Sequence, residues 1–113
     1  MDDRARPAGL RVRDGLTETQ PDLLGQVFSA LADPSRRHVL GYISDRGSAT
    51  ATELTGELPM TRQAVSKHLA TLADAGLVEA QRQGREMRYH LTHMGAEWDD
   101  RLDALARHLR SRA

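Results

Sequence analysis

The sequence predicts a mainly α-helical fold with one small β-hairpin. Apolar residues recur with a period of about 3.6 along most of residues 21–75, as they do on one face of a helix. Between residues 78 and 91 the period changes to about 2, which is typical of strands, and the helical period then returns. The expected order is helix, helix, short strand, helix, helix, strand, strand, helix. This is the order of a winged helix-turn-helix (α-α-β-α-α-β-β-α).

Length and composition fit one small domain without disulfides. The chain has 113 residues, a formal net charge of zero at pH 7 and no cysteine. Residues 1–20 are polar and aperiodic, so we expect a disordered or loosely attached arm before a winged helix-turn-helix domain at 21–113. The lack of cysteine excludes disulfides, zinc ribbons and thiolate chemistry. No apolar run approaches the length of a membrane span or a signal peptide, which fits a cytoplasmic protein.

Capping residues delimit the first two helices. The first is expected at about residues 21–32, with an apolar stripe of Leu24, Val27, Phe28 and Leu31. Asp33 is an N-cap residue, and Pro34 suits the first position of a helix. The second helix should therefore begin at Pro34 and end near Gly47. It should bury Val39, Leu40 and Ile43.

The next segment holds the predicted helix-turn-helix. Residues 48–50 fit a short strand. Thr50 and Glu53 have the spacing of a capping box, which opens a short third helix. After a turn, Thr61 caps a fourth helix and Gly76 ends it. The apolar stripe of this fourth helix consists of Val65, Leu69 and Leu72.

A hairpin and a last helix follow. The hairpin is expected at residues 78–91, with the basic, glycine-containing segment 82–85 (RQGR) at its tip. The last helix should run from Thr92 to about residue 110. Its apolar residues are spaced four, three and four apart, and they are Trp98, Leu102, Leu105 and Leu109.

The polar face of the fourth helix has the chemistry of a DNA reader. An ordinary solvated face would more often carry long Glu and Lys side chains in i,i+4 pairs. Here no acidic residue occurs before Asp74. In the major groove Arg can bind guanine, Gln can bind adenine, and Ser or Thr can serve either base. We therefore expect DNA contacts from the fourth helix and from the wing, made by Arg62, Gln63, Ser66, Lys67, Thr71, Arg82 and Arg85.

Positive charge gathers in this same region although the net charge is zero. Residues 61–92 hold five basic and three acidic residues, whereas residues 21–60 hold three basic and five acidic ones. His68 either packs beside the apolar stripe or contacts DNA. Arg36 and Arg37 either bind phosphate or pair with a nearby aspartate. Arg88 has the simpler interpretation of a solvated strand residue.

Three runs of sequence resemble the ArsR/SmtB family of bacterial transcriptional repressors. They are FSALADPSRRHVLGYI (28–43), AVSKHLATLADAGLV (64–78) and QGREMRYHL (83–91). The resemblance implies a homodimeric winged-helix protein that binds an operator in its own promoter region and releases it when an effector arrives. By position, the family's base-reading residues fall on Arg62, Gln63, Ser66 and Lys67.

The chain departs from the metal-sensing members of that family. Those members carry cysteines in the third helix, where this sequence has ELTGEL (53–58). Thr55 and Gly56 cannot supply a thiolate, so a soft-metal site of that type is excluded. A second family site lies on the last helix, where the candidates are His90, His93, Glu97, Asp99, Asp103 and His108. Here i,i+4 ion pairs of Glu97 with Arg101 and of Asp103 with Arg107 are the simpler interpretation, and we expect no metal or other cofactor.

The two outer helices predict a dimer. Four-three-four spacing is the pattern with which helices pack on other helices, and one small core cannot shelter both outer stripes. We expect a homodimer that pairs the first and last helices about a two-fold axis, so that the operator is an inverted repeat. The interface residues should be Leu24, Phe28, Trp98, Leu102, Leu105 and Leu109.

The sequence argues against two other classes of function. A winged-helix module that binds protein would expose an apolar or acidic fourth helix, and this helix is polar and basic. A small enzyme is not expected, because the chain has no plausible Ser-His-Asp or Cys-His arrangement and no glycine-rich phosphate loop.

Overall fold

The computed structural model describes residues 19–112, and it describes side chains from residue 22 onward. Residues 1–18 of the predicted N-terminal arm lie outside the described residues, and residues 19–20 belong to the first helix. The elements follow the predicted order and are α1 (Thr19–Ala32), α2 (Pro34–Arg46), β2 (Ala49–Thr50), α3 (Ala51–Glu57), α4 (Arg62–Asp74), β3 (Val78–Gln83), β4 (Glu86–Leu91) and α5 (His93–Arg112).

Local caps set the ends of α2 as predicted. The Asp33 carboxylate accepts a hydrogen bond from the backbone N–H of Ser35 at 2.8 Å, and Pro34 occupies the first helical position. Gly47 follows the last residue with φ of 85°, a conformation that residues with a Cβ rarely adopt. Two local signals therefore account for both ends of this helix.

Caps also begin the two helices of the helix-turn-helix. In the capping box, the backbone N–H of Glu53 donates to Thr50 Oγ1 and the N–H of Thr50 donates to Glu53 Oε1, both at 3.0 Å. At the start of α4, Thr61 Oγ1 accepts a hydrogen bond from the N–H of Ala64 at 3.0 Å. These bonds fix where α3 and α4 begin, and so they fix which residues form the first turn of α4.

The strands form a three-stranded antiparallel sheet in the order β2-β4-β3. The hairpin register pairs Gln83 with Glu86, so the turn itself consists of Gly84 and Arg85 alone. Arg82 lies in β3 opposite Met87 and is not part of the turn, which corrects the four-residue tip expected from the sequence. Gly84 has φ of 59°, which suits this tight two-residue turn.

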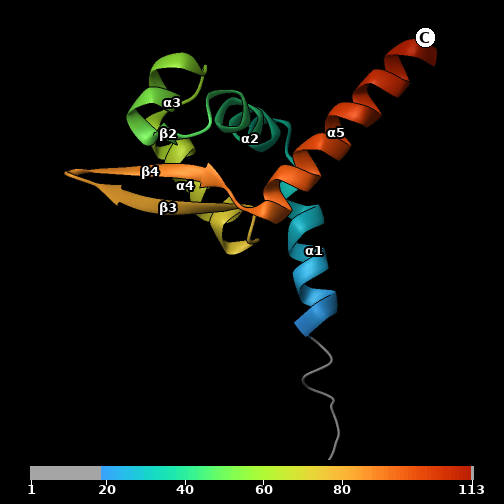
Figure 1. Cartoon of the computed structure of the whole chain (residues 1–113), viewed down its shortest axis with the longest axis horizontal. Helices are drawn as coiled ribbons and strands as arrows, with labels where there is room; N and C mark the ends of the chain where they lie inside the picture. The colour runs from blue at the N-terminus through green and yellow to red at the C-terminus, as the bar shows by residue number, and fades with distance from the viewer. Residues whose placement is uncertain (1–18, 113) are drawn as a thin grey trace, which may run out of the picture.

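The core lies between the helices and the inner part of the sheet. All three stripe residues predicted for α2 and all three predicted for α4 are buried. In α1 only part of the predicted stripe is buried, because Val27 and Leu31 face the core whereas Leu24 and Phe28 are exposed. The outer ends of α1 and α5 project from the body, on the side away from the wing tip (Figure 1).

A close backbone contact joins the start of α5 to the end of α4. Thr92 Oγ1 donates a hydrogen bond to the carbonyl of Gly76 at 2.6 Å and accepts one from the N–H of Gly95 at 3.0 Å. Gly95 is buried, and a Cβ added there would lie 1.9 Å from the carbonyl oxygen of Leu77. Only glycine therefore fits at this point of α5 without displacing the neighbouring backbone.

Among residues 19–112, no helix combines the length and the apolar composition that crossing a membrane requires.

Candidate nucleic-acid interface

Helix α4 exposes the polar face that the sequence predicts. Burial of Val65, Leu69 and Leu72 against the core turns the opposite side of the helix outward. Four of the predicted DNA contacts on this helix are exposed, and they are Arg62, Gln63, Ser66 and Lys67. Thr71, one turn further along, is half-buried, and so is His68. That these residues contact DNA stays a prediction. Such contact requires an accessible polar surface, and the exposed side of α4 provides one.

The first turn of α3 lies against the N-terminus of α4. Arg62 Nη1 donates a hydrogen bond to Thr52 Oγ1 at 3.3 Å, although the two residues belong to different helices. Both side chains are exposed, so the hydroxyl and the guanidinium lie on one continuous surface. Thr52 was not among the predicted site residues, because nothing in its local sequence indicates that it would lie beside Arg62.

A hollow of about 340 Å³ separates α4 from the wing. Its helical side includes Thr52, Arg62 and Ser66, and its wing side includes Arg85, Met87 and Tyr89. The predicted base-reading helix and the predicted wing contact therefore flank one concave surface. Two of the predicted DNA contacts on α4 and one on the wing meet here.

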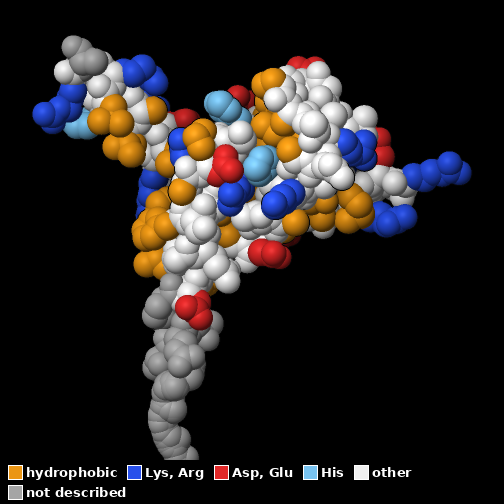
Figure 2. All heavy atoms as spheres, turned by 180° about the vertical axis from the view of Figure 1, so that it is seen from behind, with side chains coloured by type: hydrophobic (Ala, Val, Ile, Leu, Met, Phe, Trp, Pro, Cys, Tyr) orange, Lys and Arg blue, Asp and Glu red, His pale blue; other side chains and the backbone are white. Residues whose placement is uncertain are grey.

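The wing places basic side chains at the far end of the molecule. Arg82 and Arg85 are both exposed, and within residues 19–112 neither guanidinium forms an ion pair. Seen from behind, basic side chains project from the end of the wing (Figure 2). Guanidinium groups in such a position are available for phosphate oxygens or for a groove of DNA.

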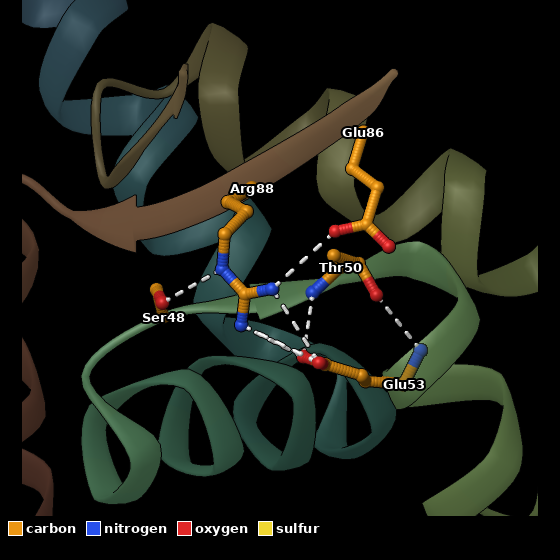
Figure 3. A network of polar contacts seen from close by, with 5 residues as sticks. All are labelled: Ser48, Thr50, Glu53, Glu86 and Arg88. Carbon is orange, nitrogen blue, oxygen red and sulfur yellow. Dashed lines mark hydrogen bonds and ion pairs between the residues drawn. The ribbon is translucent and has the colours of Figure 1, made fainter. Parts of the chain in front are cut away.

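Arg88 has a different role from the solvated strand residue that the sequence suggests. Its Nε donates to Ser48 Oγ at 3.1 Å, and its Nη2 lies 3.1 Å from Glu53 Oε1 (Figure 3). The Glu86 carboxylate is 3.7 Å from Nη1. The pKa of Glu53 is held below its usual value, mainly because the Thr50 backbone N–H donates to its carboxylate and also because Arg88 lies beside it. Arg88 thus links the wing to α3.

The basic residues at the start of α2 are engaged within the chain. Arg36 pairs with Asp33 at 3.2 Å, and Arg37 Nη1 donates to the backbone carbonyl of Leu31 at 2.6 Å. The pKa of Asp33 is lowered, mainly by the hydrogen bond from the Ser35 N–H. Of the two interpretations of this arginine pair, the structure favours internal pairing and helix capping over a free phosphate site.

The histidines and acids near α5 do not converge on one point. Within the described part of the chain, no group of three or more His, Cys, Asp or Glu side chains is arranged to hold a metal ion. His90 lies 3.4 Å from Glu79, and His93 lies 3.6 Å from Glu97. The predicted pair of Glu97 with Arg101 was wrong, because Arg101 lies over the Trp98 ring at 5.3 Å from its centroid.

Asp99 and Asp103 are two further acidic candidates on α5. The predicted pair of Asp103 with Arg107 is also missing from the ion pairs among residues 19–112. Partial burial raises the pKa of Asp99, and the neighbouring carboxylate of Asp103 raises it further. The carboxylates of α5 are therefore less fully paired than their i,i+4 spacing suggests.

Apolar side chains remain exposed on α1 and α5. Leu24 and Phe28 of α1 are 50% and 54% exposed, and Leu105 and Leu109 of α5 are 52% and 59% exposed. Figure 2 shows hydrophobic side chains gathered along both helices. Trp98 and Leu102 are partly buried against the core. Phe28 meets Trp98 edge to face with ring centroids 5.7 Å apart, so the two outer helices touch within one chain.

A family model and several known proteins match the sequence of this chain. A helix-turn-helix domain family model matches residues 31–81. The uncharacterized HTH-type transcriptional regulator YuzN of Bacillus subtilis is 45% identical over 65 residues, which cover 52% of this chain and 71% of that protein. The chain spans only 56% and 62% of the length of two further curated relatives that it matches.

Solved structures match over more of the chain. An ArsR-like transcriptional regulator from Rhodococcus sp. RHA1 is 37% identical, with a TM-score of 0.61, and the match covers 79% of this chain and 94% of that one. The homodimeric winged helix-turn-helix DNA-binding domain of Mb0332 from Mycobacterium bovis, described as a possible ArsR-family regulator, is 27% identical. Its TM-score is 0.68, and the match covers 92% of this chain and 90% of that one.

Proposed function

The chain belongs to the ArsR family of winged helix-turn-helix transcriptional regulators, and we propose that it is a homodimeric repressor that binds an inverted-repeat operator. The observation that carries this proposal is the surface formed by α4 and the wing. An exposed, acid-free helix N-terminus and a basic hairpin tip flank one hollow. A repressor of this kind acts on operator DNA in the cell, so we propose a cytoplasmic location for the protein.

The arrangement suits duplex DNA with α4 in the major groove. Arg62 and Gln63 at the N-terminus of α4 are exposed, and residues in this part of a recognition helix reach base edges. The helix dipole adds positive potential at the same end. The hollow beside the helix leaves space for a phosphate backbone, while Arg85 on its far wall approaches the backbone or the adjacent minor groove. Ser66 and Lys67 extend the same contact surface along the helix.

The wing should contribute affinity that depends on salt and little on sequence. Replacing Arg82 and Arg85 by Ala should weaken binding to operator and unrelated DNA nearly alike. Each lost phosphate contact should make the slope of log K against log salt shallower by about one unit, because fewer counterions are released. Fluorescence anisotropy over a salt series measures this slope. A double variant with the slope of the native protein would remove the wing from the phosphate contacts.

The exposed apolar side chains on α1 and α5 support the proposed dimer. Leu24 and Phe28 on α1 and Leu105 and Leu109 on α5 are each at least half exposed. Large apolar side chains clustered on a surface mark sites of association. Two chains that pair these helices about a two-fold axis would bury all four, and a stable interface of this kind should exceed about 1,000 Å² in total.

Introducing a charge on α5 should separate the subunits. Leu105→Glu places an unpaired carboxylate in the proposed interface, and we expect monomers that bind the operator at least about 100-fold more weakly, because the two half-sites lose their linkage. Ala104→Glu is a matched control, since Ala104 is exposed and lies outside the apolar stripe of the same helix. Sedimentation gives the association state. A native protein that is monomeric at micromolar concentration would overturn the proposed dimer.

The operator geometry tests the whole proposal. A footprint on DNA upstream of the protein's own gene should show two protected half-sites related by inverted symmetry. Their centres should be about 34 Å apart, or a multiple of that distance, because two α4 helices related by a two-fold axis enter successive major grooves on one side of the duplex. Protection of a single unrepeated half-site would contradict a dimeric reader.

A further inference from the structure

The outer half of the wing has little support from the rest of the sheet. Strand β2 pairs with β4 only at Tyr89 and Arg88. Beyond Arg88, toward the tip, the hairpin consists of two strands, and residues 81–87 are exposed. A two-stranded ribbon of this kind is marginally stable by itself. Arg88 therefore stands at the last position where the wing is attached to the domain.

The attachment at Arg88 is a branched set of contacts with the N-terminal end of α3. Its guanidinium reaches both carboxylate oxygens of Glu53, at 3.1 Å and 3.4 Å, and the hydroxyl of Ser48. Glu53 Oε1 also accepts a hydrogen bond from the backbone N–H of Thr50, so the capping box holds the same carboxylate that Arg88 contacts (Figure 3). A planar guanidinium with several donors fixes direction as well as distance.

The same turn of α3 also touches the recognition helix. Thr52 accepts a hydrogen bond from Arg62 of α4, and its neighbour Glu53 pairs with Arg88 of β4. Two consecutive residues thus contact the two parts of the proposed DNA surface. The first turn of α3 is therefore a shared support for the start of α4 and for the wing.

We propose that Glu53 and Arg88 form a positioning pair, which holds the wing at a fixed place relative to α4 so that Arg85 reaches DNA while α4 occupies the major groove. This inference rests on the proposed DNA-binding function and adds a residue pair that does not itself touch DNA. Without the pair, the hairpin tip would sample more positions, and DNA binding would have to restrict that motion.

The pair should affect wing order far more than folding. Glu53 is 47% exposed and Arg88 is 23% exposed at the side chain, and ion pairs with exposed partners contribute little to stability. Glu53→Gln is the informative variant, because its amide oxygen can still accept the Thr50 N–H whereas the charge that binds Arg88 is lost. Glu57→Gln is the matched control, since Glu57 lies on the same helix and pairs with Arg46 at 3.9 Å, away from the wing.

The first readout needs no DNA. Because the chain has no cysteine, cysteines introduced at the exposed positions Gln83 and Ala73 can carry spin labels on the wing and on α4. Labelled protein diluted with unlabelled protein reports the distance within one subunit. We expect a broader distance distribution in Glu53→Gln and Arg88→Gln than in the native protein and in Glu57→Gln. An unchanged distribution in both variants would overturn the proposal.

The second readout is a double-mutant cycle on operator affinity. Glu53→Gln and Arg88→Gln should each lower affinity by about threefold to tenfold, at an unchanged melting temperature, and Glu57→Gln should not. In an Arg82→Ala, Arg85→Ala background the further loss should disappear, because the outer wing then has neither of the two arginines through which its position is proposed to affect DNA binding. Additive losses, or losses matched by a fall in melting temperature, would overturn the proposal.

These experiments distinguish a failure of the proposed DNA-binding function from a failure of the positioning role. If the native protein binds no operator, the proposed function is wrong and the positioning role is wrong with it. If the native protein binds and Arg85→Ala weakens it while Glu53→Gln does not, only the positioning role is wrong.

Discussion

Replacing Arg62 and Gln63 together by Ala should lower affinity for the operator by about two to four orders of magnitude. Each side chain is exposed at the N-terminus of α4, where a recognition helix reaches base edges. A good bidentate contact of Arg with guanine or of Gln with adenine is worth about 1–3 kcal/mol of discrimination. Specificity should also relax, at one base position per half-site for each residue removed.

The matched control for this variant removes the same two side-chain types elsewhere. Gln26 on α1 and Arg46 on α2 are exposed, and neither is on the surface between α4 and the wing. Their double Ala variant should bind the operator like the native protein. A mobility-shift assay gives both affinities, and circular dichroism checks that both variants are folded. Native affinity in the Arg62 and Gln63 variant would mean that α4 does not read the operator.

Gly95→Ala should strongly destabilise the folded protein. Its Cβ would lie 1.9 Å from the carbonyl oxygen of Leu77, and the obstacle is backbone that holds the junction of α4 and β3. Overpacking at such a contact costs about 2–4 kcal/mol, after the gain in helix propensity of Ala over Gly is offset. For a domain of this size the melting temperature should fall by at least about 10 °C.

A second glycine, Gly41, provides a control at which substitution by Ala should raise stability instead of lowering it. Gly41 lies within α2, and a Cβ added there has no atom within 4 Å outside its own helix backbone and chain neighbours. Gly41→Ala should therefore stabilise the protein by about 0.5–1 kcal/mol through helix propensity. Thermal denaturation followed by circular dichroism measures both variants. A Gly95→Ala protein that melts at or above the native temperature would show that the junction can move apart at little cost.

Much of the fold was predictable because its boundaries depend on local signals. Asp33 and Thr61 cap helices with their own side chains, and Gly47 ends α2 through its positive φ. These features act within a few residues of where they occur, so a single sequence contains them. The change of apolar period at residue 78 likewise marks the wing, since it follows from the geometry of helices and strands.

What could not be predicted depends on which elements become neighbours. Arg88 and Glu53 are 35 residues apart in sequence, and no local pattern indicates that their side chains meet. The apolar stripe of α1 shows which side is apolar, but only the packing shows that Val27 is covered within the chain while Phe28 remains exposed. The tight fit at Gly95 has the same origin, because it depends on the path of the backbone at Leu77.

The candidate site likewise has a part that the sequence predicts and a part that depends on tertiary packing. Arg62, Gln63, Ser66 and Lys67 could be proposed from their spacing on one helix face. The hollow between α4 and the wing, and the place of Thr52 on its wall, required the arrangement of three separate elements. The sequence predicts that Arg82 lies at the hairpin tip, whereas the register of the two strands places it before the turn.

The central claim is that α4 and the wing together form the DNA-binding surface, and amide chemical shifts on titration with an operator duplex test it most directly. The largest changes should occur in residues 61–67 and at the wing end, residues 82–87, with smaller ones in the first turn of α3. The apolar residues of α1 and α5 should change little, because the proposed dimer already covers them. Changes concentrated on α1 and α5, with α4 and the wing unaffected, would contradict the account.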